Sequence, residues 1–187
     1  MKIMLLAGHS ATGKTWAAKE IARKFDCELI LERAIIDKVV ERKGFARARD
    51  CVKKFGFGPL LEETRAETLK VIKESGSENI ILDGAYDGGL PDYLRKNLGD
   101  AELLVVGVAS NRTMRRHRMM KRTGWQKDQA IKELKFIDKI KEKMGAHEVV
   151  KAADAKVKNK GKFNDFLSAL EGIAKRFFGN NHSFQKG

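Results

Sequence analysis

The chain is poor in cysteine, in proline and in long apolar runs. Its 187 residues include two cysteines and two prolines. Cys27 and Cys51 form no C-x-x-C pair, so the sequence offers neither a zinc motif nor a disulfide framework. No apolar run approaches the roughly 20 residues that a membrane span requires. These absences predict a protein of the reducing cytoplasm that does not cross a membrane.

Acidic side chains are scarce relative to basic ones. The chain has 38 Lys and Arg against 25 Asp and Glu, which gives a net charge of +13. Such a surplus suits an anionic ligand, and nucleic acid is the second candidate partner. A solvated, lysine-rich surface is the alternative explanation, because much of the surplus alternates with glutamate over residues 127–143.

One segment carries a specific motif, with the spacing G-x-x-x-x-G-K-[ST] of a phosphate-binding P-loop. The apolar run Lys2–Ala7 before it predicts a buried parallel strand, and residues 16–25 after it predict a helix. This strand–loop–helix context is what the motif requires, whereas the alternative is a glycine-rich turn with an incidental lysine. The motif consists of Gly8, His9, Ser10, Ala11, Thr12, Gly13, Lys14 and Thr15.

Each part of this loop has a physical role in binding phosphate. Gly8 and Gly13 permit backbone conformations that let several N–H groups point inward. The following helix adds the positive end of its dipole. Lys14 is expected to reach the β- and γ-phosphates of ATP, and the Thr15 hydroxyl to hold Mg²⁺. The sequence therefore predicts ATP and Mg²⁺ as cofactors.

Strands and helices alternate along the chain, which predicts an α/β protein of three layers with a parallel five-stranded sheet. The expected strands are residues 2–7, 28–31, 79–82, 103–109 and 155–158. The expected helices are residues 16–25, 34–43, 46–55, 60–75, 90–97, 112–122, 126–144 and 163–178. We expect a single domain over residues 1–187, with a frayed tail over residues 179–187.

A second acidic element of the site is predicted at Asp83. It follows the apolar run Ile80–Leu82, and ligands of open α/β sheets bind beyond the carboxyl ends of the strands. A carboxylate there can hold the water shell of Mg²⁺ opposite Thr15. The alternative is an aspartate that caps the next helix.

Residues 111–122 contain six Lys and Arg side chains and His117 but no acid. Arg115, Arg118 and Arg122 lie at i, i+3 and i+7, on one face of the expected helix. Arginine forks stabilise the negative charge that phosphoryl transfer spreads over oxygen atoms. Without an anion these side chains repel one another, which argues against a merely solvated face. A nucleic-acid backbone would also satisfy them.

In order along nearly the whole chain, these residues resemble the small P-loop kinases of the nucleoside monophosphate kinase type, and among them dephospho-coenzyme A kinase and archaeal adenylate-kinase-related proteins. The resemblance implies a small helical lid over about residues 120–145. It also implies that the strand end at Asn159 and Gly161 contacts the adenine of ATP. The matching segments are the P-loop, Phe55-Gly56, residues 81–85, residues 108–110 with the three arginines, and residues 153–161.

The chain departs from the resembling kinases at two places. Where they carry an aspartate that approaches the acceptor, this chain has Glu32, which would orient the acceptor. Where they often carry an Arg-Asp pair, it has Ile137-Asp138. Lys135 and Lys139 are the candidates to compensate, although lysine lacks the bidentate fork of arginine.

The sequence predicts an ATP-dependent kinase for a small nucleotide-like acceptor, either dephospho-coenzyme A or a nucleoside monophosphate. Two alternatives stay open: a nucleic-acid-associated P-loop ATPase or polynucleotide kinase, and a nucleotide-binding regulator without catalysis. The oligomeric state is left open. The expected catalytic residues are Lys14, Glu32, Asp83, Arg118 and Arg122. The expected nucleotide-binding residues are the P-loop, Arg115, Asn159 and Gly161, and the expected metal ligands are Thr15 and Asp83.

Overall fold

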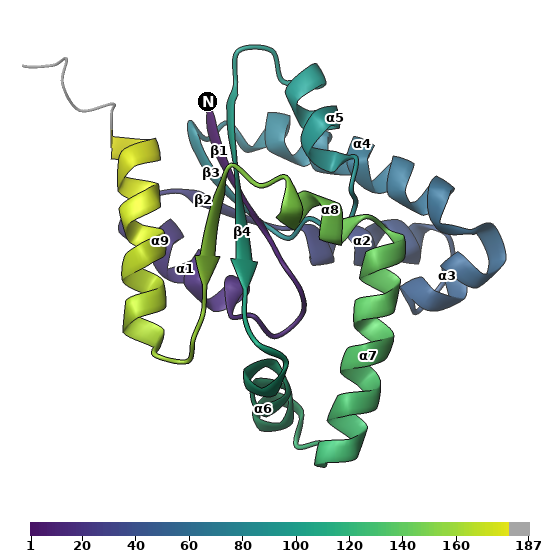
Figure 1. Ribbon diagram of the computed structural model, residues 1–187. Helices are drawn as coiled ribbons and strands as arrows, with labels where there is room; N and C mark the ends of the chain where they lie inside the picture. Colours follow the sequence, from purple (N-terminus) through teal and green to yellow (C-terminus); the bar gives the residue numbers. More distant parts are fainter. Residues whose placement is uncertain (180–187) are drawn as a thin grey trace, which may run out of the picture.

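The computed structural model describes residues 1–179 (Figure 1). Five strands form one sheet in the order β2-β3-β1-β4-β5, and every pairing is parallel. The sheet and the helices around it confirm the predicted α/β fold. The strands are β1 (Lys2–Ala7), β2 (Glu28–Leu31), β3 (Asn79–Asp83), β4 (Glu102–Ala109) and β5 (Ala155–Lys158). Apart from Gly179, the expected frayed tail lies outside the described residues.

Helices cover both faces of the sheet, and the residues of β1 alternate between the two. Met4 and Leu6 pack toward α1 and α9, whereas Ile3 and Leu5 pack toward α2, α4, α5 and α8. The central strand β1 is buried at every position, because helices cover both of its faces and neighbouring strands pair with both of its edges. These helices are α1 (Lys14–Lys24), α2 (Glu32–Arg42), α4 (Phe57–Ser75), α5 (Leu90–Asn97), α8 (Ala146–Lys151) and α9 (Phe163–Phe178).

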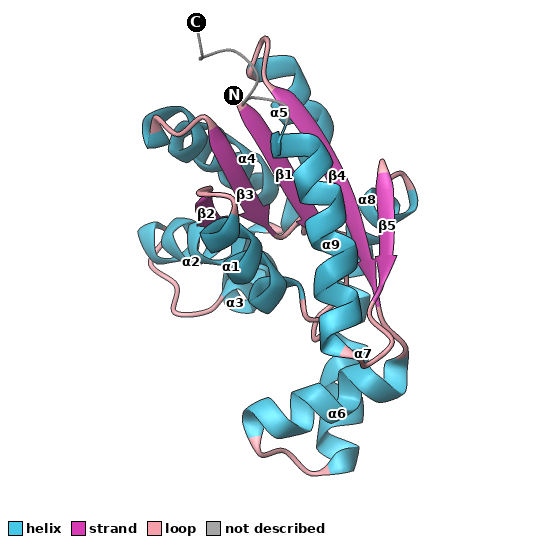
Figure 2. Cartoon of the chain, turned by 90° about the vertical axis from the view of Figure 1, so that its left-hand side faces the viewer, coloured by secondary structure: helices cyan, strands magenta, loops and turns pink. Residues whose placement is uncertain are grey.

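The other helices extend the molecule at one end of the sheet. In Figures 1 and 2, α6 (Arg112–Thr123) and α7 (Lys127–Lys143) project beyond the carboxyl ends of the strands, and α3 (Ala48–Phe55) lies beside α2. Met119, Ala130 and Leu134 join α6 to α7 in an apolar cluster of their own. These two helices include the segment where the lid is expected, and its closure stays a prediction.

The expected strands agree with the structure to within one residue. The helices differ more at their ends: α4 begins three residues earlier than expected and includes Pro59, which a first helical turn tolerates because its N–H needs no partner. The six-residue α8 was not predicted, because it is too short to show a helical period. No helix among residues 1–179 has the length and apolar character to cross a membrane.

Candidate nucleotide-binding site

The P-loop joins the end of β1 to the start of α1, and its glycines are required by the space around them. A Cβ at Gly8 would lie 2.3 Å from the Val108 carbonyl oxygen, and one at Gly13 would lie 2.8 Å from the Asn159 amide nitrogen. Gly13 has a φ of 100°, and Ala11 has a φ of 60°, an unusual value for a side-chain-bearing residue. The loop is therefore wrapped tightly between the ends of β4 and β5.

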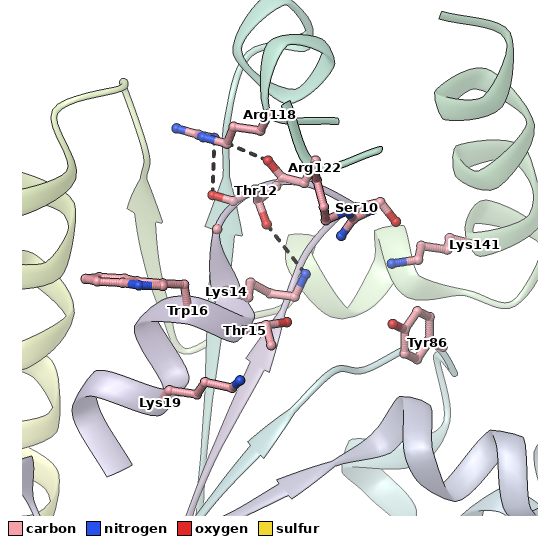
Figure 3. A pocket seen from close by; sticks show the side chains of 12 residues that line it. Ser10, Thr12, Lys14, Thr15, Trp16, Lys19, Tyr86, Arg118, Arg122 and Lys141 are labelled. Atoms are coloured by element: carbon pink, nitrogen blue, oxygen red, sulfur yellow. Dashed lines mark hydrogen bonds between the residues drawn. The ribbon is translucent and has the colours of Figure 1, made fainter. Parts of the chain in front are cut away.

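A pocket of about 390 Å³ opens over this loop (Figure 3). At its floor, the Lys14 ammonium donates hydrogen bonds to the carbonyl oxygens of Gly8, at 2.8 Å, and of His9, at 3.1 Å. Burial lowers the pKa of Lys14, and the nearby Asp83 carboxylate opposes that shift. Outside the loop, the residues that line the pocket are Trp16, Lys19, Tyr86, Arg118, Arg122 and Lys141.

Thr15 and Asp83 meet beside Lys14, as the sequence predicts for a metal site. The Thr15 hydroxyl donates to Asp83 Oδ2 at 2.5 Å. Asp83 Oδ1 is buried and has no hydrogen-bond partner among the described residues. Mg²⁺ prefers oxygen ligands, so the Thr15 hydroxyl and the Asp83 carboxylate, whose Oδ1 has no hydrogen-bond partner among the described residues, fit this ion. The alternative, a helix-capping aspartate, does not hold, because the next helix has Gly89 at its N-cap position.

Arg118 ties the P-loop to the end of β5. Its guanidinium donates to the Ala11 carbonyl at 3.2 Å and to Asn159 Oδ1 at 2.7 Å. The Asn159 amide donates in turn to the Thr12 carbonyl at 2.9 Å, and its Oδ1 also accepts from the Gly161 N–H. Asn159 and Gly161 thus support the loop from behind and do not line the pocket, so their contact with adenine stays a prediction.

The three arginines of α6 have different partners. Arg118 and Arg122 line the pocket. Arg115 is 5% exposed and donates to the Ser10 carbonyl at 2.7 Å and to Asp138 Oδ1 at 2.5 Å. Arg115 therefore fastens the P-loop to α7, and its guanidinium does not line the pocket.

Asp138 has a second neighbour in the His9 imidazole, whose Nδ1 lies 3.3 Å from Asp138 Oδ1. Burial by itself raises the pKa of Asp138, but the nearby His9 and Arg115 outweigh it and hold the pKa at about 2. The aspartate of the Ile137-Asp138 pair is thus an anchor for the P-loop.

We expect Asp138→Asn to lower the free energy of unfolding by up to about 3 kcal/mol near neutral pH, because it leaves the Arg115 guanidinium buried without a counter-charge. A carboxylate with a lowered pKa stabilises the fold above its ordinary pKa and stops doing so as the pH falls toward about 2. The difference between the wild type and the variant should therefore narrow in acid. Urea unfolding at a series of pH values measures it, with the exposed Asp100→Asn as control; an equal effect of the two variants would contradict the assignment.

Glu32 is fully buried at the start of α2. Its Oε2 accepts the Tyr86 backbone N–H at 2.9 Å, and its Oε1 has no hydrogen-bond partner among the described residues. Burial raises the pKa of Glu32 to about 8, so the carboxyl is largely protonated at neutral pH. It lines neither this pocket nor the second cavity, and reaches both only through its neighbour Tyr86.

A second cavity of about 530 Å³ adjoins the first, since Tyr86 and Lys141 line both. It lies among α2, α3, α4 and α7, and its wall combines apolar side chains with basic ones. The apolar lining includes Ile36, Val52, Phe57, Leu60, Phe136, Ile137, Ile140 and Met144. The basic lining, besides Lys141, is Arg33, Arg47, Arg49 and Lys53.

Sequence reasoning missed the contribution of Lys141. The structure leaves Lys135 and Lys139 exposed and away from the nucleotide pocket, whereas Lys141 is buried and lines it. The available signal was spacing: Lys141 lies seven residues after Leu134, on the inward face of α7.

The sequence is similar to archaeal proteins over most of its length. No model of a known protein family matches the chain. A UPF0200/UPF0201 protein of Archaeoglobus fulgidus is 24% identical over 181 residues, a match that covers 92% of this chain and 55% of that longer protein. A UPF0200 protein of Saccharolobus solfataricus is 24% identical over 186 residues, which cover 96% of each chain.

Solved structures of kinases share the fold. A shikimate kinase from Bacteroides thetaiotaomicron superposes with a TM-score of 0.59 at 18% identity, over 94% of this chain and 98% of that chain. A gluconokinase from Sinorhizobium meliloti gives 0.54 at 16% identity, over 97% and 98%. The chain thus has the fold of the small P-loop kinases.

Proposed function

We propose that this protein is an ATP-dependent phosphotransferase whose acceptor is a small nucleotide-like molecule. The observation that carries the proposal is that Lys14 and Thr15 line one cavity, where Thr15 is hydrogen-bonded to Asp83, and that a second cavity adjoins the first. The two cavities provide separate places for a phosphoryl donor and an acceptor, joined at Tyr86 and Lys141.

The donor would bind over the P-loop. Lys14 and the N-terminus of α1 offer positive charge to its phosphates. Mg²⁺, held by Thr15 and Asp83, would neutralise charge on the β- and γ-phosphates. Arg118 and Arg122 border the same pocket and would stabilise the charge of the transition state.

The acceptor would occupy the second cavity. Its apolar wall suits an aromatic or aliphatic body, and its arginines suit phosphate groups. A wholly polar acceptor would leave the apolar wall without a partner. Both dephospho-coenzyme A and the nucleoside monophosphates combine these two features. Phe55-Gly56 ends α3 directly before Phe57, which lines the cavity, and this placement favours dephospho-coenzyme A slightly.

Two chain elements would control the reaction. Helix α7 borders both cavities, so closure of α6 and α7 over them would exclude water from the transferring group. Burial raises the pKa of Glu32 to about 8, so its carboxyl is largely protonated at neutral pH and would orient the acceptor without taking its proton. Tyr86, whose N–H binds Glu32, would link that carboxyl to the acceptor cavity.

A nucleic-acid acceptor is the second candidate, and the observation that favours it is the exposed side of α6. Arg112, His117 and Lys121 are exposed there. Their contact with a phosphate backbone would show as saturable RNA or DNA binding that weakens steeply with salt. Absence of binding at low salt would remove this candidate.

The test of the proposed function is Mg·ATP consumption against a panel of acceptors. The panel contains dephospho-coenzyme A, AMP, CMP, GMP, UMP and a 5′-hydroxyl oligonucleotide, each also run with Lys14→Ala. We expect one small nucleotide to stimulate ADP formation in a Lys14-dependent manner. Stimulation by the oligonucleotide alone would move the function to polynucleotide kinase. ATP binding without turnover on any acceptor would indicate a regulator.

A further inference from the structure

Lys141 occupies an unusual place for a lysine. It lies near the end of α7, and its side chain is 6% exposed in a helix whose other lysines are mostly exposed. Its Nζ atom lies 4.2 Å from the centroid of the Tyr86 ring. Figure 3 shows the side chain extending from α7 into the nucleotide pocket, with Tyr86 beneath it. Lys141 and Tyr86 line both cavities, so these two residues stand where the cavities meet.

The nearby carboxylates are engaged elsewhere. Asp138, one turn earlier on α7, is paired with Arg115, and the His9 imidazole lies 3.3 Å from it. Glu32 accepts the Tyr86 N–H, and burial keeps it largely protonated near neutral pH. A buried ammonium without a full counter-charge is costly to the fold. An anion that enters the junction from either cavity would remove that cost.

Resting on the proposed function, we propose that Lys141 is a catalytic residue whose ammonium contacts the phosphoryl group as it passes from the nucleotide pocket to the acceptor cavity. It faces Arg118 and Arg122 from the opposite wall of the pocket. No bond to Lys141 forms. The bond from the γ-phosphorus to its bridging oxygen breaks, the bond to the acceptor oxygen forms, and the ammonium neutralises charge on the oxygens between. The proton of a hydroxyl acceptor leaves to a carboxylate or to water.

The electrostatic surroundings of Lys141 support this role. Burial, together with the nearby charges of Lys14 and Arg115, lowers the pKa of Lys141 to about 7, although Glu32 and Asp138 oppose the shift. A bound anion favours the charged form, so above neutral pH its binding should take up a proton. The groups whose charge acts on Lys141 are Lys14 of α1, Glu32 of α2, Arg115 of α6 and Asp138 of α7. Tyr86, after β3, lies against its ammonium, and Arg118 and Arg122 of α6 line the same pocket.

Calorimetric titration tests the assignment without any acceptor. Mg·ADP and Mg·ADP with aluminium fluoride, a mimic of the transferring phosphoryl group, are titrated into the full chain at about pH 8, above the pKa of Lys141. Two buffers with different heats of ionisation report the protons taken up. The chains compared are the wild type, Lys141→Met, Lys141→Arg, Glu32→Gln and, as control, the exposed Lys139→Met.

We expect Lys141→Met to weaken binding of the fluoride complex by at least about tenfold, the value of a hydrogen bond to a charged group, and to leave Mg·ADP binding unchanged. Lys141→Arg should restore much of the affinity but abolish the proton uptake, because arginine stays charged. Glu32→Gln should keep the uptake. A melting temperature equal to or above that of the wild type would show that Lys141→Met is folded.

Distinct outcomes would overturn the proposal. Equal affinity of the wild type and Lys141→Met for the fluoride complex, or an equal loss for Mg·ADP, would exclude a contact with the phosphoryl group. Uptake that persists in Lys141→Arg and vanishes in Glu32→Gln would assign the proton to Glu32 instead. Failure of the wild type to bind Mg·ADP would overturn the proposed function itself, and this assignment with it.

Discussion

Lys14→Ala should lower kcat for phosphoryl transfer by about 10²–10³-fold or more, the loss typical of removing a preorganised charge from a transition state. Lys14 is buried at the pocket floor, where its ammonium is held by loop carbonyls within reach of an incoming phosphate. Alanine removes the charge, and water cannot supply an equivalent one in the same place. Steady-state ADP formation with the preferred acceptor measures the effect.

Two controls make this prediction specific. Lys38→Ala removes an equal charge from the exposed side of α2 and should leave kcat unchanged. Thermal unfolding of Lys14→Ala should show a folded protein, because the substitution also removes a buried ammonium whose pKa burial lowers. Transfer that survives Lys14→Ala in a folded protein would mean that the P-loop does not bind the phosphoryl donor.

Asp83→Asn should produce a fall in kcat of about 10²–10³-fold, together with a higher Mg²⁺ concentration for half-maximal rate. Asparagine keeps the size of the side chain but removes the negative charge from Oδ1, the buried atom without a hydrogen-bond partner among the described residues. It also changes the partner of the Thr15 hydroxyl. The measurement is ADP formation at a series of Mg²⁺ concentrations.

Asp92→Asn is the matched control, because Asp92 is exposed on α5, where it pairs with Arg95 of the same helix. It should not alter the Mg²⁺ dependence. If Asp83→Asn reduced the rate but left the Mg²⁺ dependence unchanged, Asp83 would act by positioning Thr15 and would not be a metal ligand. Both variants are expected to fold.

The fold was predictable because its sequence signals are local. The β1 segment is short and apolar, and it is followed by the glycine and lysine spacing of a P-loop and then by a helical pattern, which is the context that the motif requires. Asp83 could be placed because ligands of open α/β sheets bind beyond the carboxyl ends of the strands. The structure adds that β3 pairs directly with β1, which puts Asp83 beside the P-loop. These two placements are enough to predict that Thr15 and Asp83 lie close together.

The parts of the site that sequence could not predict depend on contacts across the fold. Helical spacing put Arg115, Arg118 and Arg122 on one face, but it could not show that Asp138 would engage the first of them. Lys141 looked like one of many lysines in α7. Its burial arises because Tyr86, from the loop after β3, packs against it. Likewise, the second cavity exists only where four helices meet.

The most direct test of the central claim is to quantify ADP, inorganic phosphate and phosphorylated acceptor together in one Mg·ATP reaction with the acceptor that stimulates turnover. We expect the wild type to form ADP and phosphorylated acceptor in equal amounts, with little free phosphate. Lys14→Ala should form neither product. Equal amounts of ADP and inorganic phosphate, with no phosphorylated acceptor, would show an ATPase and contradict the account.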